Sequence, residues 1–244
     1  MKTVVLFGGG VNSVAMLLGM YERKIVPDHI VFSDTGSEHP NTYAYMKGVL
    51  ARWLIATQFP AIEVVKLRTG TGDESLEDEL NRRKALPALA YGLKTCSLKW
   101  KRRPYEAWAK QTFGAYPAPG VREAVGYDAG ESHRHGNASE CVWMPLVEWG
   151  WDRSTCIAVI ESSGLPVPPK SSCYFCPAMK VREILKLRDE HPALYERACE
   201  IEADAIANGQ TSGSTIGLGR RFRWSNLEDA PIQPELDFPC DCGR

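Results

Sequence analysis

Two patterns of apolar residues recur along the chain. Short, nearly continuous apolar runs indicate strands buried on both faces, and they occupy residues 3–7, 28–33, 61–67, 121–125 and 141–144. Apolar residues spaced three and four apart indicate helices, which cover residues 12–22, 40–57, 105–113, 153–162, 178–188 and 192–207. Strands that alternate with helices predict an α/β fold with a parallel sheet covered on both faces.

Three segments lack such periodicity. Residues 69–84 are polar and charged, which favours an exposed excursion, and residues 164–172 form a Pro-rich loop. From residue 208 onward the chain is rich in Gly, Ser and Pro. We therefore expect an α/β domain over residues 1–150, a helical, cysteine-bearing part over 151–209 and a flexible tail over 210–244.

Composition narrows the class of protein. The 244 residues are 44% hydrophobic and 24% charged, values that exclude a disordered chain, a coiled coil and a collagen-like repeat. A net charge of −1 argues against a protein that coats nucleic acid, although a local basic groove is compatible with it. No apolar run approaches the ~18 residues that span a bilayer, and no cleavage signal follows the apolar start. We expect a cytoplasmic protein whose 8 cysteines serve thiol or metal chemistry rather than disulfides.

A glycine-rich loop joins the first strand to the first helix, with the sequence Gly8-Gly9-Gly10-Val11-Asn12-Ser13. Glycines permit close approach of a ligand to the backbone, and the helix N-terminus favours an anion. No Gly-Lys-Ser/Thr follows, and the third glycine of a dinucleotide fingerprint is missing. The spacing alone is compatible with a phosphate site or with a simple tight turn.

This loop resembles the PP-loop of the adenine nucleotide alpha hydrolase superfamily, Ser-Gly-Gly-x-Asp-Ser. Gly9, Gly10 and Ser13 match, whereas Gly8 replaces the leading Ser and Asn12 replaces the Asp. The resemblance implies that the loop holds the triphosphate of ATP, with Mg²⁺, for cleavage between the α and β phosphates. Asn12 removes a negative charge beside the polyphosphate.

Two further segments resemble the phosphoadenosine phosphosulfate (PAPS) reductase-like branch of that superfamily. The stretch from Asp34 to Thr42 resembles Asp-Thr-Gly…Pro-Glu-Thr, and it follows the second strand. The stretch from residue 126 to 134 resembles Gly-Ile-Arg-x-x-Glu-Ser-x-Arg, with matches at Gly126, Glu131, Ser132 and Arg134. The family's first arginine is Asp128 here, and this reversed charge disfavours a sulfated substrate.

Three more segments follow in the family's order. Five basic residues lie within positions 94–103, a pattern typical of a solvated face, and residues 94–104 resemble Cys-Cys-x-x-Arg-Lys-Val-x-Pro. Cys96 and Lys101 are in register there, while Ser97 replaces the second cysteine. Residues 144–152 resemble Pro-Leu-x-x-Trp-x-x-x-Asp, and Cys173-Tyr174-Phe175-Cys176 occupies the place of the second cysteine pair. Five segments in order favour the family more than they favour one substrate.

The cysteines leave several interpretations open. A Cys-x-x-Cys sequence is typical of a redox pair, half a zinc site or ligands of an iron–sulfur cluster. The resemblance implies that Cys96, Cys173 and Cys176 are three ligands of a four-iron, four-sulfur cluster, with zinc and free thiols as alternatives. Near the end of the chain, Cys242-Gly243 resembles the reductases' Glu-Cys-Gly, whose cysteine attacks the sulfonucleotide. A disordered end and a metal-binding hook are alternatives for this tail.

The first functional hypothesis is ATP-dependent adenylylation of a substrate with release of pyrophosphate, coupled to sulfur transfer. The alternatives are a thioredoxin-dependent sulfonucleotide reductase and a non-catalytic nucleotide-binding accessory subunit of a mobile-element or CRISPR-type system. Candidate partners are a nucleic-acid substrate, thioredoxin and a second copy of the chain. The candidate catalytic residues are Asp34, Asp128 and Cys242. The candidate nucleotide-binding residues are Gly8, Gly9, Gly10, Asn12, Ser13, Ser33, Thr35, Gly36, Lys101, Gly126, Glu131, Ser132 and Arg134.

Overall fold

A five-stranded parallel sheet is central to the computed structural model, which describes residues 1–131, 140–211 and 213–229. Its strands are β1 (Lys2–Leu6), β2 (His29–Asp34), β3 (Ile62–Lys66), β4 (Val121–Val125) and β5 (Val142–Trp143). The spatial order is β3-β2-β1-β4-β5, and every neighbouring pair is parallel. The predicted α/β fold is confirmed, and each predicted strand overlaps an observed one.

The order in which the chain adds strands to the sheet reverses at β1, because β2 and β3 lie on one side of it and β4 and β5 on the other. Val5 pairs with Ile30 of β2 on one side and with Ala124 of β4 on the other. The connections that leave the carboxyl ends of β1 and β4 therefore diverge. In open parallel sheets, such a reversal creates the crevice in which ligands bind.

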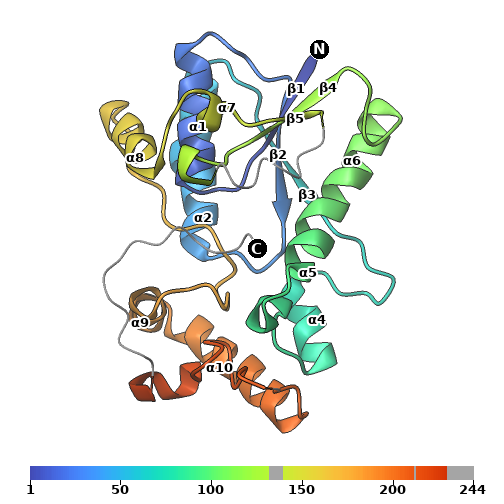
Figure 1. Ribbon diagram of the computed structural model, residues 1–244, viewed down its shortest axis with the longest axis vertical. Helices are drawn as coiled ribbons and strands as arrows, with labels where there is room; N and C mark the ends of the chain where they lie inside the picture. Colours follow the sequence, from blue (N-terminus) through green and yellow to red (C-terminus); the bar gives the residue numbers. More distant parts are fainter. Residues whose placement is uncertain (132–139, 212, 230–244) are drawn as a thin grey trace. The chain divides into compact units, whose positions relative to one another are not determined.

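Helices cover both faces of the sheet (Figure 1). One face packs against α1 (Val11–Glu22), the helix formed by α2 (Pro40–Tyr45), η1 (Met46–Leu50) and α3 (Ala51–Ala56), and also α7 (Pro145–Glu148) and α8 (Arg153–Ser162). The opposite face packs against α6 (Arg103–Phe113). Val5 faces the first layer and Val4 the second, and both are fully buried. Burial on both faces explains why the strands are nearly continuous apolar runs.

The chain divides into two compact units, and neither is one continuous stretch. Unit 1 comprises Met1–Asp34, Glu38–Lys66 and Arg102–Ser171, whereas unit 2 comprises Thr35–Ser37, Leu67–Lys101 and the described residues from Ser172 onward. This division differs from the boundary expected at residue 150. Buried Cys156 and Ile160 place α8 in the core of the sheet unit, so that helix does not belong to a separate C-terminal part.

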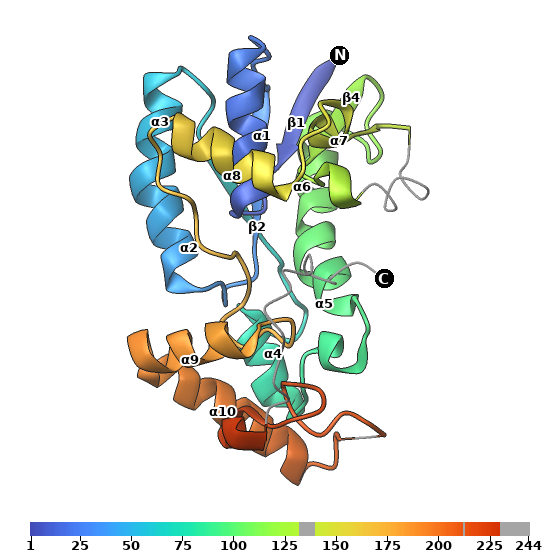
Figure 2. The same ribbon diagram turned by 60° about the vertical axis from the view of Figure 1, so that its left-hand side comes forward.

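Unit 2 is built of helices and short helical turns. They are α4 (Leu76–Arg83), η2 (Ala88–Tyr91), α5 (Thr95–Ser97), η3 (Leu98–Arg102), α9 (Val181–Glu190), α10 (Pro192–Ala207) and η5 (Trp224–Asp229). The helices α9 and α10 lie side by side (Figure 2). Fully buried Trp100, Phe175 and Trp224 lie in the core of this unit. Within the described residues, no helix is both long and apolar enough to cross a membrane.

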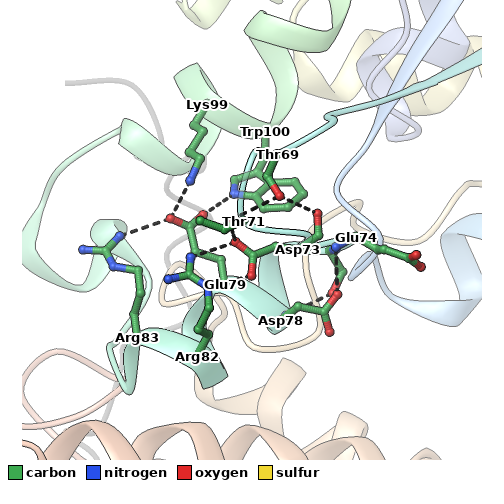
Figure 3. Close-up of polar contacts among 11 residues, drawn as sticks. Thr69, Thr71, Asp73, Glu74, Asp78, Glu79, Arg82, Arg83, Lys99 and Trp100 are labelled. Atoms are coloured by element: carbon green, nitrogen blue, oxygen red, sulfur yellow. Dashed lines mark hydrogen bonds and ion pairs between the residues drawn. The ribbon is translucent and has the colours of Figure 1, made fainter.

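The predicted exposed excursion over residues 69–84 is wrong. The segment contains α4, whose Leu76 and Leu80 are buried in the core of unit 2. Ser75 caps this helix by accepting a hydrogen bond from the N–H of Asp78 (3.1 Å). Two acidic residues of the segment, Asp73 and Glu79, are also buried, and they accept hydrogen bonds from Arg82 and from the indole of Trp100 (Figure 3). A polar sequence here indicates paired charges rather than solvent exposure.

Candidate functional site

The glycine loop after β1 has a conformation that requires glycine at one position. Gly9 has φ +79°, and a Cβ there would lie 2.8 Å from Cγ2 of Thr42. Gly10 is the N-cap of α1, and no side chain caps this helix. Ser13 closes the turn, since its Oγ accepts from the N–H of Gly10 (3.1 Å) and donates to the Gly10 carbonyl (2.9 Å). Gly10 thus offers no side-chain acceptor to the first N–H groups of α1, and anion binding there stays a prediction.

Ser171 packs against this loop from the end of unit 1. Its hydroxyl donates a hydrogen bond to the carbonyl of Gly8, and its Cβ would be 3.5 Å from a Cβ at Gly9. The sequence analysis missed Ser171 because the preceding proline-rich segment predicts only a loop. A contact that joins residues 163 positions apart leaves no local pattern.

A second loop, which follows β4, lies directly against the glycine loop. A Cβ at Gly126 would lie 3.2 Å from the backbone nitrogen of Ser13 and 3.3 Å from the carbonyl carbon of Asn12. Only glycine permits two backbones to approach so closely without displacement. The structure therefore brings together two segments that the sequence analysis assigned to one site, at the reversal of strand order.

Asn12 joins these loops to the start of α8. Its side-chain Nδ2 donates to Oδ2 of Asp128 (3.0 Å) and to Oε2 of Glu131 (3.5 Å). Its Oδ1 accepts from the guanidinium of Arg153 (2.8 Å). Arg153 is a second residue that the sequence analysis missed, because it is 141 positions from its partner.

Asp128 is nearly inaccessible, with 4% of its surface exposed. Among the described residues, its carboxylate accepts hydrogen bonds from the Asn12 amide and from the N–H of Gly130 (3.0 Å), and both donors are neutral. The carboxylate also raises the pKa of the Cys156 thiol, although burial is the larger cause of the rise to about 12. Cys156 is thus a core residue with a protonated thiol, as its place in a helix predicts.

Asp34 stands at the end of β2. Its carboxylate accepts from the Tyr43 hydroxyl (2.5 Å) and pairs with Lys66 (3.4 Å). Burial and this hydrogen bond raise the pKa of Tyr43 well above its ordinary value. Asp34 also lines a mainly apolar cavity of ≈ 520 Å³ beside β2, β3 and α3. Its catalytic role remains a prediction, as does nucleotide binding by half-buried Ser33, which pairs with Val65.

The segment Thr35–Ser37 belongs to unit 2, where it holds the start of α4. The Thr35 carbonyl accepts from the N–H of Leu76 (2.9 Å), and Oγ of Ser37 accepts from the N–H of Glu77 (3.2 Å). Gly36 has φ +71°, and a Cβ there would lie 2.7 Å from Cβ of Ser75. A structural role therefore accounts for this glycine, while nucleotide binding by Thr35 and Gly36 stays a prediction.

The three predicted cysteine ligands also belong to unit 2. All three are half-buried against its apolar core. Cys173 and Cys176 flank a turn in which the N–H of Cys176 donates to the Cys173 carbonyl (3.0 Å), and Cys173 Sγ lies 3.3 Å from the Thr35 hydroxyl. Within the described part of the chain, no three His, Cys, Asp or Glu side chains form a set that could hold a metal ion. This finding concerns a single metal ion, so the binding of a four-iron, four-sulfur cluster by Cys96, Cys173 and Cys176 stays a prediction.

The remaining predicted residues divide into two groups. Lys101 is half-buried at the end of the basic segment in unit 2, and its role is a prediction. Three others, Ser132, Arg134 and Cys242, lie outside the described residues.

Comparison with known proteins gives structural likenesses but no sequence match. No family model matches the sequence, and no curated protein matches it. Among solved structures, the chain is similar to the U34-tRNA thiolase NcsA from Methanococcus maripaludis, described with its [4Fe-4S] cluster. The match has 12% sequence identity and a TM-score of 0.44, and it covers 88% of this chain and 74% of that chain. At this identity and score, the likeness supports no statement about chemistry.

Proposed function

We propose that this chain is a PP-loop-type protein that binds ATP and activates a substrate by adenylyl transfer. The observation that carries the proposal is the close packing of the loops after β1 and β4. These loops are so close that a Cβ at Gly126 would lie 3.2 Å from the Ser13 nitrogen. The loops meet at the reversal of strand order, where open parallel sheets bind ligands. The uncapped start of α1 adds N–H groups and a dipole that favour phosphate.

In the proposed reaction, an oxygen of the substrate attacks the α-phosphorus of ATP. The bond from that phosphorus to the bridging oxygen breaks, and pyrophosphate leaves with the electron pair. Backbone N–H groups of the glycine loop orient the phosphates. Asp128 and Glu131 are the carboxylates that would hold Mg²⁺, which supplies charge neutralisation of the phosphates when bound.

The proposal ends at the adenylylated substrate. Sulfur delivery would require a cysteine centre, and cluster binding by Cys96, Cys173 and Cys176 stays a prediction. No step is therefore assigned to these cysteines.

Calorimetric titration of the full chain with ATP and Mg²⁺ tests the binding site. Gly8 is exposed, and a Cβ there would have no atom within 4 Å, so Gly8→Asp adds a charge to the loop without a clash. Repulsion of on the order of 1–4 kcal/mol should weaken ATP binding at least about fivefold. Gly70→Asp is the matched control, because Gly70 is also exposed and open. Equal affinities of both variants and the wild type would contradict the site.

Product analysis tests the reaction class. Pyrophosphate release from ATP, in the presence of the acceptor, is the expected result. Release of sulfite from PAPS with reduced thioredoxin would contradict adenylyl transfer and support the reductase alternative. ATP binding without either product would support the accessory-subunit alternative.

A further inference from the structure

The charges around Asn12 are unevenly distributed. One side of its amide faces the carboxylates of Asp128 and Glu131, and the other side accepts from the guanidinium of Arg153 at 2.8 Å. A polyphosphate at the glycine loop requires positive charge nearby. The resembled family has an arginine at the position of Asp128, and this chain has a buried carboxylate there.

We propose that Arg153 binds the phosphates of the nucleotide and replaces that missing cation. The inference rests on the proposed ATP-binding function, since it names a residue of the same site. Arg153 is the first residue of α8, and its contact with Asn12 holds the guanidinium beside the second residue of α1. The cation and the N-terminus of α1 thus lie at one loop.

The backbone around Arg153 is fixed on both sides. The carbonyl of Trp151 accepts from the N–H of Ala129 (2.8 Å), which ties this segment to the loop after β4. The Asp152 carboxylate caps α8 by accepting from the N–H of Thr155 (2.8 Å). Cys156, three residues after Arg153, is fully buried in the core of unit 1. The backbone from which the Arg153 side chain extends is therefore set before any ligand binds.

The side chain itself is exposed. A guanidinium has five N–H donors in a planar fork that matches phosphate oxygens, so the contact with Asn12 leaves further donors for a ligand. Lysine at this position would keep the charge and lose the fork. The proposal therefore distinguishes Arg153→Lys from Arg153→Gln.

The test compares calorimetric titrations of the full chain with Mg-ATP and with adenosine. Arg153→Gln should raise the Kd for ATP about 10- to 100-fold, because charge-assisted hydrogen bonds to phosphate are lost. Its Kd for adenosine should stay within about twofold of the wild-type value, and the salt dependence of ATP binding should weaken. The Kd of Arg153→Lys for ATP should lie between the wild-type value and that of Arg153→Gln. Arg52→Gln, an exposed arginine of α3, is the matched control and should bind ATP as the wild type does.

The outcomes distinguish ATP binding by the chain from phosphate binding by Arg153. If the wild type binds no ATP, the proposed function fails, and this inference fails with it. If the wild type binds ATP and Arg153→Gln binds it equally well, the inference alone is overturned. Equal losses for ATP and adenosine, or an equal loss in Arg52→Gln, would also overturn it, because a contact with phosphate predicts neither. Thermal unfolding of each variant establishes that the binding data refer to folded protein.

Discussion

The side-chain amide of Asn12 donates a hydrogen bond to the carboxylate of Asp128, with 3.0 Å between Nδ2 and Oδ2. Asn12 departs from the PP-loop pattern and Asp128 departs from the PAPS reductase-like segment that the sequence resembles, and the structure pairs the two departures. An aspartate at position 12 would place two carboxylates in contact, whereas asparagine donates to the one at position 128. Asparagine at position 12 therefore suits a carboxylate at position 128, because its amide can donate the hydrogen bond that an aspartate could not.

Replacement of Asn12 by Asp should destabilise the protein at neutral pH. Repulsion between carboxylates at ~4 Å costs on the order of 1–4 kcal/mol. Attraction to Arg153 offsets little of it, because Arg153 is exposed and Asp128 is buried. Thermal unfolding at pH 8 and pH 5 should show a larger loss at pH 8, since one carboxyl takes up a proton at lower pH.

Two further variants control this experiment. Asn12→Ala removes the hydrogen bond without adding charge, so its effect should not vary between pH 5 and pH 8. Combining Asn12→Asp with Asp128→Asn should restore most of the stability lost at pH 8. If the stability loss of the double variant equals the sum of the losses of the two single variants, the proposed repulsion is disproved.

Glu79 should stabilise unit 2 only while it is ionised. It is 5% exposed and accepts from the side chains of Trp100 (2.6 Å), Lys99 (2.6 Å) and Arg83 (3.2 Å), as Figure 3 shows. Burial raises the pKa of Glu79, but these hydrogen bonds outweigh it and hold the pKa below the ordinary 4.5. A lowered folded pKa means that the stabilisation is complete above pH 4.5 and is lost as the pH falls through the folded value.

Denaturant unfolding of Glu79→Gln checks this. The free energy of unfolding should fall by roughly 1–3 kcal/mol at pH 7, and the difference from the wild type should shrink at pH 3. Glu190→Gln is the control, because Glu190 forms an exposed pair with Lys186 (3.7 Å). Such pairs contribute about 0.5 kcal/mol or less. A deficit of Glu79→Gln that persists at pH 3 would contradict the role of ionisation.

The two glycines after Gly8 should respond differently to substitution. Gly9→Ala should destabilise the protein by at least about 1–2 kcal/mol, because φ is +79° and Thr42 blocks the Cβ at 2.8 Å. Gly10→Ala should cost less, about 0.5–1 kcal/mol, since its Cβ would meet Ser171 at an ordinary 3.6 Å and only the poorer N-cap preference of Ala opposes it. Thermal unfolding of both variants measures this, and equal stabilities would refute the assigned conformation of the loop.

Glu202 should hold the segment that follows α10. This carboxylate is 1% exposed and accepts from the N–H groups of Leu218 (2.7 Å), Trp224 (2.9 Å) and Ser225 (3.1 Å). Glu202→Gln replaces one acceptor oxygen by a donor, which should cost roughly 3 kcal/mol and speed hydrogen exchange at those amides. Glu200→Gln, at an exposed position two residues away, should change neither. Unchanged protection of Leu218 in Glu202→Gln would contradict this role.

The sheet was predictable because its signal is local. Val4 and Val5 are buried on opposite faces, and such double burial produces the continuous apolar runs from which the strands were predicted. The loops at Gly8–Ser13 and at Gly126 follow strands, so their meeting at one edge followed from the parallel arrangement.

Other features depended on contacts between distant residues. The helix α4 was missed because its buried charges have partners such as Trp100, 21 residues from Glu79. Its capping serine, three residues before Asp78, was the signal that could have revealed it. Arg153 and Ser171 reach the glycine loop across more than 140 residues, and no spacing pattern encodes such a contact. The role of the cysteines was predicted from the resemblance alone, and among the described residues they form no site for a single metal ion.

Because the two units alternate along the chain, neither can be produced by a simple truncation, and their arrangement restricts how the gene arose. The chain passes between the units five times, after residues 34, 37, 66, 101 and 171. No single cut can release either unit intact, and end-to-end fusion of two genes cannot have produced this arrangement. Unit 2 instead consists of two segments inserted into the sheet unit, one after β2 and one after β3, and a third segment that follows Ser171. Loops tolerate such additions without loss of the sheet, so the strand order of unit 1 does not require its sequence to be continuous.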